Sequence, residues 1–326
     1  MKRLFGIIVA GIVAVGCGGA AAGTPPLARA HWTALVHVSR PLDLAGPRRD
    51  GSLVLAAAGK LWLLRAGAVT PFAAGYRSPG GEEPYIALSA VGHRGCSFGS
   101  DTVYALRLAS GHGVVAISRN GVRMFATLSA HGLIDGIAFD ETGRFGYRLL
   151  VTVEHGATST VAAIDCHGHV STITGRAPKI EGGIAVAPST FGRFAGDLIA
   201  SDENTGRIYA IAPSGRSSLV ARSGLPHGGD TGVESEAFLP AHGRFEALLA
   251  DRGTPGNRHP GDDVVLHVSS AALFAAGARP GDLLDATEGG AETVAVHCGA
   301  QGCTVRHVAD GPAIAHPEGH IAILPR

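Results

Sequence analysis

The chain has 326 residues, of which 45% are hydrophobic and 17% are charged, and its 27 basic and 27 acidic side chains give no formal net charge at pH 7. This composition is typical of a folded chain and excludes an intrinsically disordered one. Binding to nucleic-acid phosphates needs concentrated Lys and Arg, and no basic cluster appears beyond the N-terminus, so the sequence also argues against a nucleic-acid partner.

The first residues predict export. Lys2 and Arg3 precede the uncharged stretch 4–16, which has the parts of a signal peptide and is too short to cross a bilayer as a stable helix. Residues 14–17 (Ala-Val-Gly-Cys) resemble a bacterial lipobox, in which Cys17 would be lipidated and residues 17–31 would form a tether. Simple secretion, with cleavage within 20–22 or 28–30, and an uncleaved anchor are the alternatives. We therefore expect a cell-surface lipoprotein or a secreted protein, with one domain over residues 32–326.

Short aliphatic runs recur along this domain. They lie at 53–56, 102–105, 149–152, 198–201, 248–251 and 283–286. The first five are about 45–50 residues apart, a period typical of repeat architectures. Most runs are preceded by an acidic residue that opens a short apolar strand, and these openings begin at Glu83, Asp135, Glu181, Glu234 and Glu318.

Each repeat unit is therefore predicted to form a strand, a turn and a second strand, followed by further strands. Four strands in a unit of this length are typical of a β-propeller blade, and we expect six blades. The segment 234–318 must hold two blades with no clear opening for the second, which leaves five blades or an irregular sixth open. One short helix is expected at 270–277.

The two ends of the domain are expected to meet. The final unit, 316–325, has no sheet after it, whereas the strands expected at 52–56, 60–64 and 68–72 lack a clear inner strand. Joining them completes one blade, closes the ring and removes its exposed edges.

Four cysteines follow Cys17, and an even count in an exported chain indicates disulfides. Cys298 and Cys303 stand at facing ends of two alternating segments, a separation that a disulfide can bridge. A Cys96–Cys166 bond follows only by elimination, and two buried thiols are the alternative.

The repeat resembles the NHL and gluconolactonase (SMP-30-like) group of six-bladed propellers. Residues 183–188 (GIAVAP), followed by 198–208, are the best match to a blade, and 317–322 (PEGHIA) match a blade opening. In the gluconolactonase group a Glu, an Asn and an Asp near inner-strand starts hold a divalent cation at the channel mouth. The resemblance implies Glu318 for the Glu and Asp135 for the Asp. The Asn has no counterpart, and Glu181 occupies the comparable place.

Inner strands of a propeller converge on its axis, so the five opening acids are expected to form a ring of carboxylates. Such carboxylates raise one another's pKa unless a cation neutralises them, and oxygen-rich sites suit Ca²⁺ or Mg²⁺. The alternative is that the acids bind backbone NH groups of the neighbouring blade. His320 shares a strand face with Glu318 and is the candidate general base, unless it is merely hydrogen-bonded within its strand.

Two functions are compatible with these patterns. The first is an exported, monomeric propeller that binds a small molecule, glycan or protein partner at its channel face and touches a membrane only through its N-terminal lipid anchor. The second is a divalent-metal-dependent hydrolase or lactonase of the gluconolactonase type. The missing Asn ligand favours the first.

Overall fold

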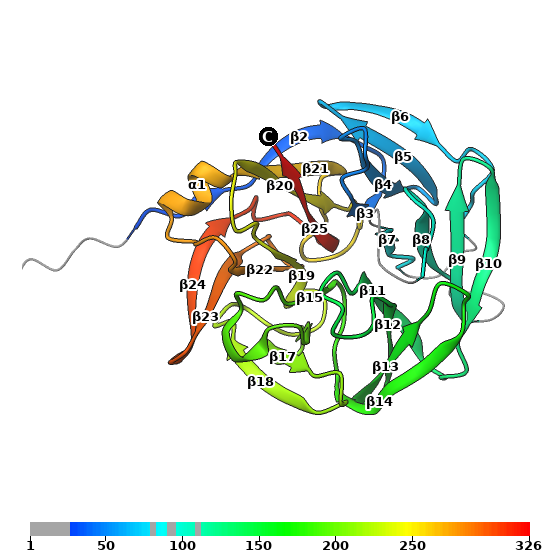
Figure 1. The fold of residues 1–326 in the computed structure, drawn as a ribbon. Helices are drawn as coiled ribbons and strands as arrows, with labels where there is room; N and C mark the ends of the chain where they lie inside the picture. The colour runs from blue at the N-terminus through cyan, green and yellow to red at the C-terminus, as the bar shows by residue number, and fades with distance from the viewer. Residues whose placement is uncertain (1–26, 79–82, 90–95, 108–111) are drawn as a thin grey trace, which may run out of the picture.

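The computed structural model describes residues 27–78, 83–89, 96–107 and 112–326 of the chain. Six β-sheets stand around a central axis in these residues (Figure 1), so the predicted six-bladed propeller is confirmed. The predicted signal peptide, Cys17 and most of the tether lie outside the described residues. Within the described part, no helix is long and apolar enough to cross a membrane.

Each blade is a largely antiparallel sheet whose strands run in order from the axis outward. The first blade contains β3 (Pro41–Ala45), β4 (Leu53–Ala57), β5 (Lys60–Arg65) and β6 (Ala68–Phe72). The second contains β7 (Ile86–Leu88), β8 (Val103–Arg107), β9 (Gly113–Ser118) and β10 (Gly121–Thr127). The third contains β11 (Leu133–Phe139), β12 (Leu149–His155), β13 (Thr158–Ile164) and β14 (Val170–Pro178). The fourth contains β15 (Ile184–Val186), β16 (Leu198–Asp202), β17 (Arg207–Ile211) and β18 (Ser217–Arg222), with a 3₁₀ turn at Gly192–Phe194.

The last two blades take strands from both ends of the chain. The fifth contains β19 (Val233–Phe238), β22 (Leu283–Thr287), β23 (Thr293–Gly299) and β24 (Gly302–Asp310), and β1 (Ala30–His31) pairs in parallel with its outer edge. The sixth contains β25 (Pro317–Pro325), β20 (Phe245–Asp251), β21 (Val264–Ser269) and β2 (Thr33–His37). The expected helix is confirmed as α1 (Ser270–Ala275).

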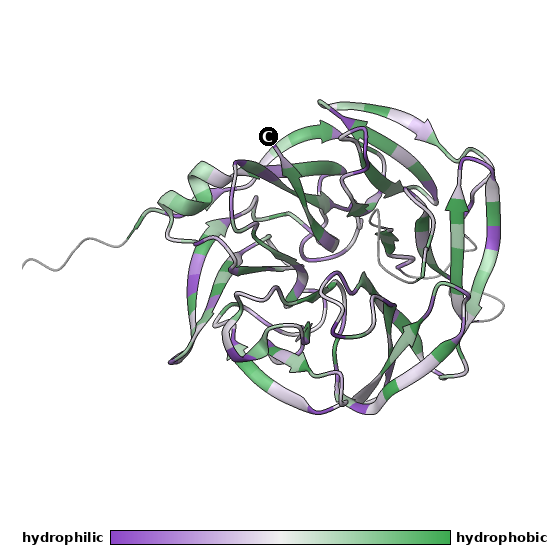
Figure 2. Cartoon of the chain, in the orientation of Figure 1, coloured by the Kyte–Doolittle hydropathy of each residue, from purple (hydrophilic) through white to green (hydrophobic). Residues whose placement is uncertain are grey.

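The six aliphatic runs form the second strands of the six blades, β4, β8, β12, β16, β20 and β22. Strands β4, β16 and β22 are buried along their whole length. A strand that is covered on both faces reads as a continuous apolar run, because no position on it faces water. In Figure 2 hydrophobic colour dominates the strands near the centre, while hydrophilic segments interrupt outer strands such as β10. Burial of one such Leu, Ile or Val side chain contributes about 1.5–3 kcal/mol.

The fifth and sixth blades are interleaved along the chain. After β19, the inner strand of the fifth blade, the chain forms β20 and β21 of the sixth. It then returns through α1 to β22–β24 of the fifth blade and ends as β25, the inner strand of the sixth. The segment 234–318 therefore contains no separate opening for its second blade, because that opening is the strand of Glu318 itself.

Both ends of the chain close the ring. The C-terminal strand β25 pairs with β20, and the N-terminal strand β2 pairs with β21 of the same blade, so the predicted closure between the chain ends is confirmed. The prediction that the C-terminal strand joins the strands of residues 52–72 was wrong. That set has its own inner strand, β3, which was not predicted.

Both expected disulfides are present. Cys298 and Cys303 are directly paired in the β23–β24 hairpin, with their Cα atoms 4.1 Å apart. The Cys96–Cys166 bond joins the segment before β8 to the turn between β13 and β14, and so links the second blade to the third. Two disulfides are typical of proteins in oxidising compartments.

Candidate functional site

Three of the five acidic openings, and Asp43 of β3, coincide with bulges in the inner strands. Pairing with the second strand slips between Pro41 and Asp43 of β3, around Asp135 of β11, at Glu234 of β19 and directly after Glu318 of β25. A bulge inserts unpaired residues and re-aims side chains out of the regular alternation of the sheet. Because these strands surround the axis, the bulges bring carboxylates of several blades into one region.

Glycine follows three of the five predicted acids, Asp135, Glu181 and Glu318, because neighbouring inner strands approach closely there. Gly182 has φ +81°, and a Cβ at this position would overlap the side chain of Glu234. The next amide, of Gly183, donates to the Glu234 carbonyl oxygen at 2.9 Å. Gly319 has φ +66°, and its Cβ would overlap the carboxylate of Asp43. The acid-glycine pattern thus marks positions that lack room for a side chain and favour left-handed backbone.

Three glutamates converge on one buried hydroxyl at the axis. The Tyr85 Oη lies 2.6 Å from Glu234 Oε1, 3.0 Å from Glu318 Oε2 and 3.1 Å from Glu83 Oε2. A hydroxyl carries one hydrogen and donates to only one of the three, so the other carboxyls need a proton or a cation of their own. One oxygen from each glutamate lies within 4.8 Å of the others. We call Glu83, Glu234 and Glu318 with Tyr85 the axial cluster.

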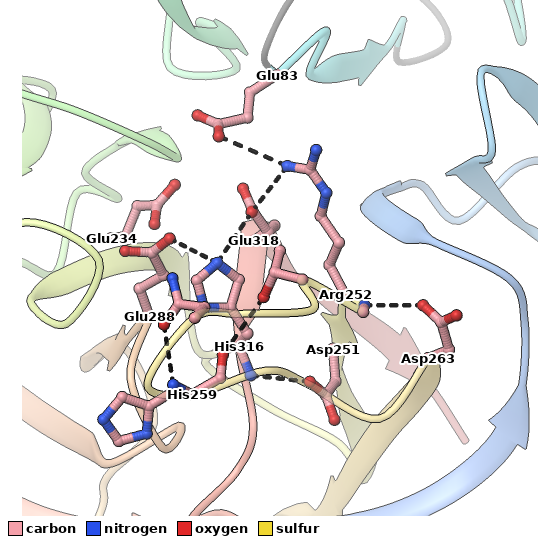
Figure 3. A network of polar contacts seen from close by, with 12 residues as sticks. Glu83, Glu234, Asp251, Arg252, His259, Asp263, Glu288, His316 and Glu318 are labelled. Atoms are coloured by element: carbon pink, nitrogen blue, oxygen red, sulfur yellow. Dashed lines mark hydrogen bonds and ion pairs between the residues drawn. The ribbon is translucent and has the colours of Figure 1, made fainter.

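Two cationic side chains border the axial cluster (Figure 3). Arg252 Nη1 lies 2.9 Å from Glu318 Oε1 and 3.6 Å from Glu83 Oε1. His316 Nε2 lies 2.9 Å from Glu288 Oε1 and 3.5 Å from Glu318 Oε1. Glu318 is therefore at the centre of the network, and its side chain is 1% exposed.

Burial and mutual repulsion determine the electrostatics of this region. Burial raises the pKa of Glu83 and of Glu234 well above the ordinary value, and the nearby carboxylate of Glu318 raises both further. Burial alone would lower the pKa of His316, but Glu288 and Glu318 raise it to about 10, so that the imidazole is cationic at neutral pH. Four carboxyls thus share two cationic side chains, and the excess must be balanced by bound protons or by a further cation.

A second acidic group lies beside the axial cluster, between the third and fourth blades. Asp135, Glu154 and Glu181 bring one oxygen each within 4.8 Å of the others. Lys179 Nζ lies 3.5 Å from Glu154 and 3.3 Å from Glu181. Asp135 is buried; its Oδ1 accepts a hydrogen bond from the Gly182 amide at 3.1 Å, while its Oδ2 has no partner among the described residues.

The structure therefore divides the five predicted carboxylates into two groups. Glu83, Glu234 and Glu318 belong to the axial cluster, whereas Asp135 and Glu181 belong to the second group. The three metal ligands predicted from the resemblance, Glu318, Glu181 and Asp135, consequently do not lie in one group.

His320 contacts Asp43 of the first blade. Its Nδ1 lies 3.0 Å from Asp43 Oδ1, and its backbone amide donates to the same oxygen at 2.8 Å. Asp43 also accepts hydrogen bonds from the amides of Leu44 and Ile86, at 2.7 Å each. Asp43 thus connects three inner strands, β3, β7 and β25. The general-base role of His320 remains a prediction.

Sequence reasoning did not identify Tyr85, Arg252 and Glu288 as parts of the site. Tyr85 stands two residues after a predicted acid, and Arg252 directly follows the fifth aliphatic run, but neither position carries a recognisable motif. Glu288 follows the sixth run. Their convergence depends on the interleaving of the last two blades, which no local pattern reveals.

No protein-family model matches the chain, and no curated protein matches its sequence. Among solved structures, it is similar to a streptogramin B lyase (TM-score 0.48, 11% identity, 83% of this chain and 70% of that chain). It is also similar to a virginiamycin B lyase from Staphylococcus aureus (TM-score 0.46, 13% identity, 82% and 70%) and to a putative gluconolactonase (TM-score 0.48, 10% identity, 91% and 94%). The six-bladed propeller that the resemblance implied is shown by the sheet order of this chain.

Proposed function

We propose that the protein binds a small-molecule ligand at its channel face, through a divalent cation held by Glu83, Glu234 and Glu318. The observation that carries this proposal is the convergence of the three carboxylates on the single hydroxyl of Tyr85. One hydroxyl hydrogen cannot satisfy three acceptors, and a bound cation would balance the charge that Arg252 and His316 leave uncompensated.

The donor set suits Ca²⁺ or Mg²⁺. All candidate donors in the axial cluster are oxygens, which both ions prefer. Two oxygens on opposite sides of Ca²⁺ are about 5 Å apart, because each lies about 2.3–2.6 Å from the ion, whereas Mg²⁺ demands about 2.0–2.1 Å. The glutamate oxygens lie within 4.8 Å of one another, a spacing that both coordination spheres allow.

The surrounding residues would orient a ligand on this face. When bound, the cation would supply a Lewis-acidic position for a ligand oxygen. Arg252 neutralises Glu318 and Glu83 on one side, and His316 holds Glu318 from the other, so the central carboxylate is fixed in place. We further propose that the protein acts outside the cytoplasm, as a lipoprotein or a secreted protein, which its two disulfides support.

Metal content and calorimetry test the proposal. Protein treated with EDTA and then titrated with Ca²⁺ or Mg²⁺ is expected to bind one equivalent. Glu318→Gln and Glu234→Gln should each weaken binding by at least about 100-fold, because loss of even an indirect metal partner costs 10–100-fold. Glu141→Gln, an exposed acid outside the axial cluster, is the matched control. Absence of saturable binding by the folded wild-type protein would exclude the cation site.

One observation favours the alternative, a metal-dependent hydrolase or lactonase. The cationic His316 lies 3.5 Å from the central carboxylate of Glu318, which places a proton donor beside the proposed cation. Turnover of simple lactones and aryl esters by the Ca²⁺-loaded protein, lost in both His316→Asn and Glu318→Gln, would establish this function. Cation binding without turnover would establish the binder.

A further inference from the structure

A cavity of about 250 Å³ opens beside the axial cluster, against the first blade. Arg40, which precedes β3, Lys60, which begins β5, and Arg252, which follows β20, line it. Tyr76 and Ser78, from the loop after β6, complete its polar wall. The volume is slightly below the range of about 300–1,000 Å³ that is usual for small-molecule pockets, so it suits one end of a ligand.

The charge of this cavity is opposite to that of the axial cluster. Three lining residues are cationic, and no described lining residue is acidic. The nearby acid Asp263 does not line the cavity, and its Oδ1 already accepts hydrogen bonds from the backbone amides of Arg40 and Gly253. Arg252 is paired with Glu318 and Glu83, but Arg40 and Lys60 form no ion pair among the described residues, so this hollow is a local site for an anion.

Arg252 connects the two sites. Both of its ion pairs, to Glu318 and Glu83, use the same nitrogen, Nη1. The described residues supply no hydrogen-bond partner to its Nη2 or Nε, and Arg252 lines the cavity. A guanidinium that binds carboxylates on one edge retains donors on its other edge for a second anion.

Tyr76 adds a neutral donor to the wall. The side chain is 4% exposed, and burial raises the pKa of its hydroxyl to about 12, so it remains protonated at ordinary pH. A buried phenol hydroxyl among cationic side chains donates to an anionic oxygen without adding charge of its own.

We infer that this cavity, which we call the basic pocket, binds the anionic end, a carboxylate or a phosphate group, of the ligand whose other end reaches the axial cluster. Only the claim that the other end of the ligand reaches the axial cluster rests on the proposed function. Arg40, Lys60 and Arg252 are the recognising residues, and the ligand class is a small organic acid or phosphate ester.

Calorimetric titration at low ionic strength with inorganic phosphate and, separately, with acetate tests the pocket and distinguishes the two anion types. The double variant Arg40→Gln/Lys60→Gln should bind the preferred probe at least about tenfold more weakly, because two charge-assisted contacts to the anion are lost. Arg65→Gln, at the opposite end of β5 from Lys60, is the matched control and should bind as the wild type does. Circular dichroism confirms that each variant is folded.

Failure of this inference is distinguishable from failure of the proposed function. Titrations in EDTA measure the basic pocket alone, since Arg40 and Lys60 lie outside the axial cluster. Anion binding that is lost in the double variant but present in EDTA supports the pocket, even if no cation binds. Equal affinity of wild type and double variant, or no binding of either anion by the wild type, overturns it, even if Ca²⁺ binds as proposed.

Discussion

A buried pair of carboxyls between the fourth and fifth blades should make the fold sensitive to pH. Glu236 on β19 and Asp285 on β22 are directly paired across the two strands. The hydroxyl of Ser201, on β16, lies 2.6 Å from Glu236 Oε1 and 2.9 Å from Asp285 Oδ2. All three side chains are buried. Because the serine donates to only one acceptor, the second contact requires a proton on a carboxyl.

The expected change in the free energy of unfolding follows from the cost of keeping this proton bound in the folded state. Burial raises the pKa of Asp285 from 3.8 to about 8. The unfolded aspartate ionises near pH 3.8, so the folded state binds the additional proton between pH 3.8 and 8, and stability falls as the pH rises through this window. At about 1.4 kcal/mol per pH unit, the cost at pH 7 is about 4 kcal/mol. Asp285→Asn removes this cost but adds an amide NH that lacks a partner, worth about 1–3 kcal/mol, so we expect a net gain of about 1–3 kcal/mol at pH 7 and none at pH 4.

Urea unfolding, followed by circular dichroism at pH 4 to 8 with the disulfides intact, measures this difference. Asp140→Asn is the matched control, because Asp140 is equally buried but its carboxylate is satisfied. It accepts backbone hydrogen bonds from Thr142, Gly143, Phe145 and Tyr147. Asp140→Asn should lose stability at every pH, because the side-chain NH₂ group of the asparagine would face backbone NH groups that need an acceptor. Parallel pH curves for the wild type and Asp285→Asn would refute the reasoning.

Cys96→Ser should lower the free energy of unfolding by about 4 kcal/mol and Cys303→Ser by about 2, because their disulfides close sequence separations of 70 and 5 residues; equal losses in urea would contradict this. Gly319→Ala should cost at least about 2 kcal/mol through its positive φ and overlap with Asp43, and an unchanged melting temperature would disprove that. In EDTA-treated protein, His316→Asn should flatten the stability curve between pH 6.5 and 10. The raised pKa of His316 contributes stability that is complete below about 6.5 and lost by about 10, so an unaltered slope in urea titrations would count against it.

The blades could be predicted from the sequence because burial of the second strands favours apolar residues at successive positions. Strand β4, for example, faces no water on either side and reads as an unbroken apolar run, Leu-Val-Leu-Ala-Ala. The inner strand β3 has no comparable apolar run. Its sequence, Pro-Leu-Asp-Leu-Ala, is ordinary for a strand, and its position is fixed by contacts of Asp43 with Ile86 and His320, which are far away in the chain.

The acids of the site could be predicted for a similar reason, but their grouping could not. Each acid-glycine pair records a local close approach of inner strands, which the sequence shows directly. Which acids share a cation depends on the direction in which each bulge aims its side chain, and on partners such as Tyr85 and Arg252. Those directions are properties of the closed ring and not of any one blade.

The interleaving of the last two blades has a consequence for biosynthesis. Neither blade can be completed from a contiguous stretch of chain, because β19 and β25 enclose strands of both, and β1 and β2 come from the other terminus. During translation the first four blades can assemble in order, but the fifth must await β24 and the sixth must await the C-terminal strand β25. Truncation of the N-terminal strands would therefore remove β1 from the fifth blade and β2 from the sixth at once, and a chain break within 239–316 would cut the connections that interleave these two blades.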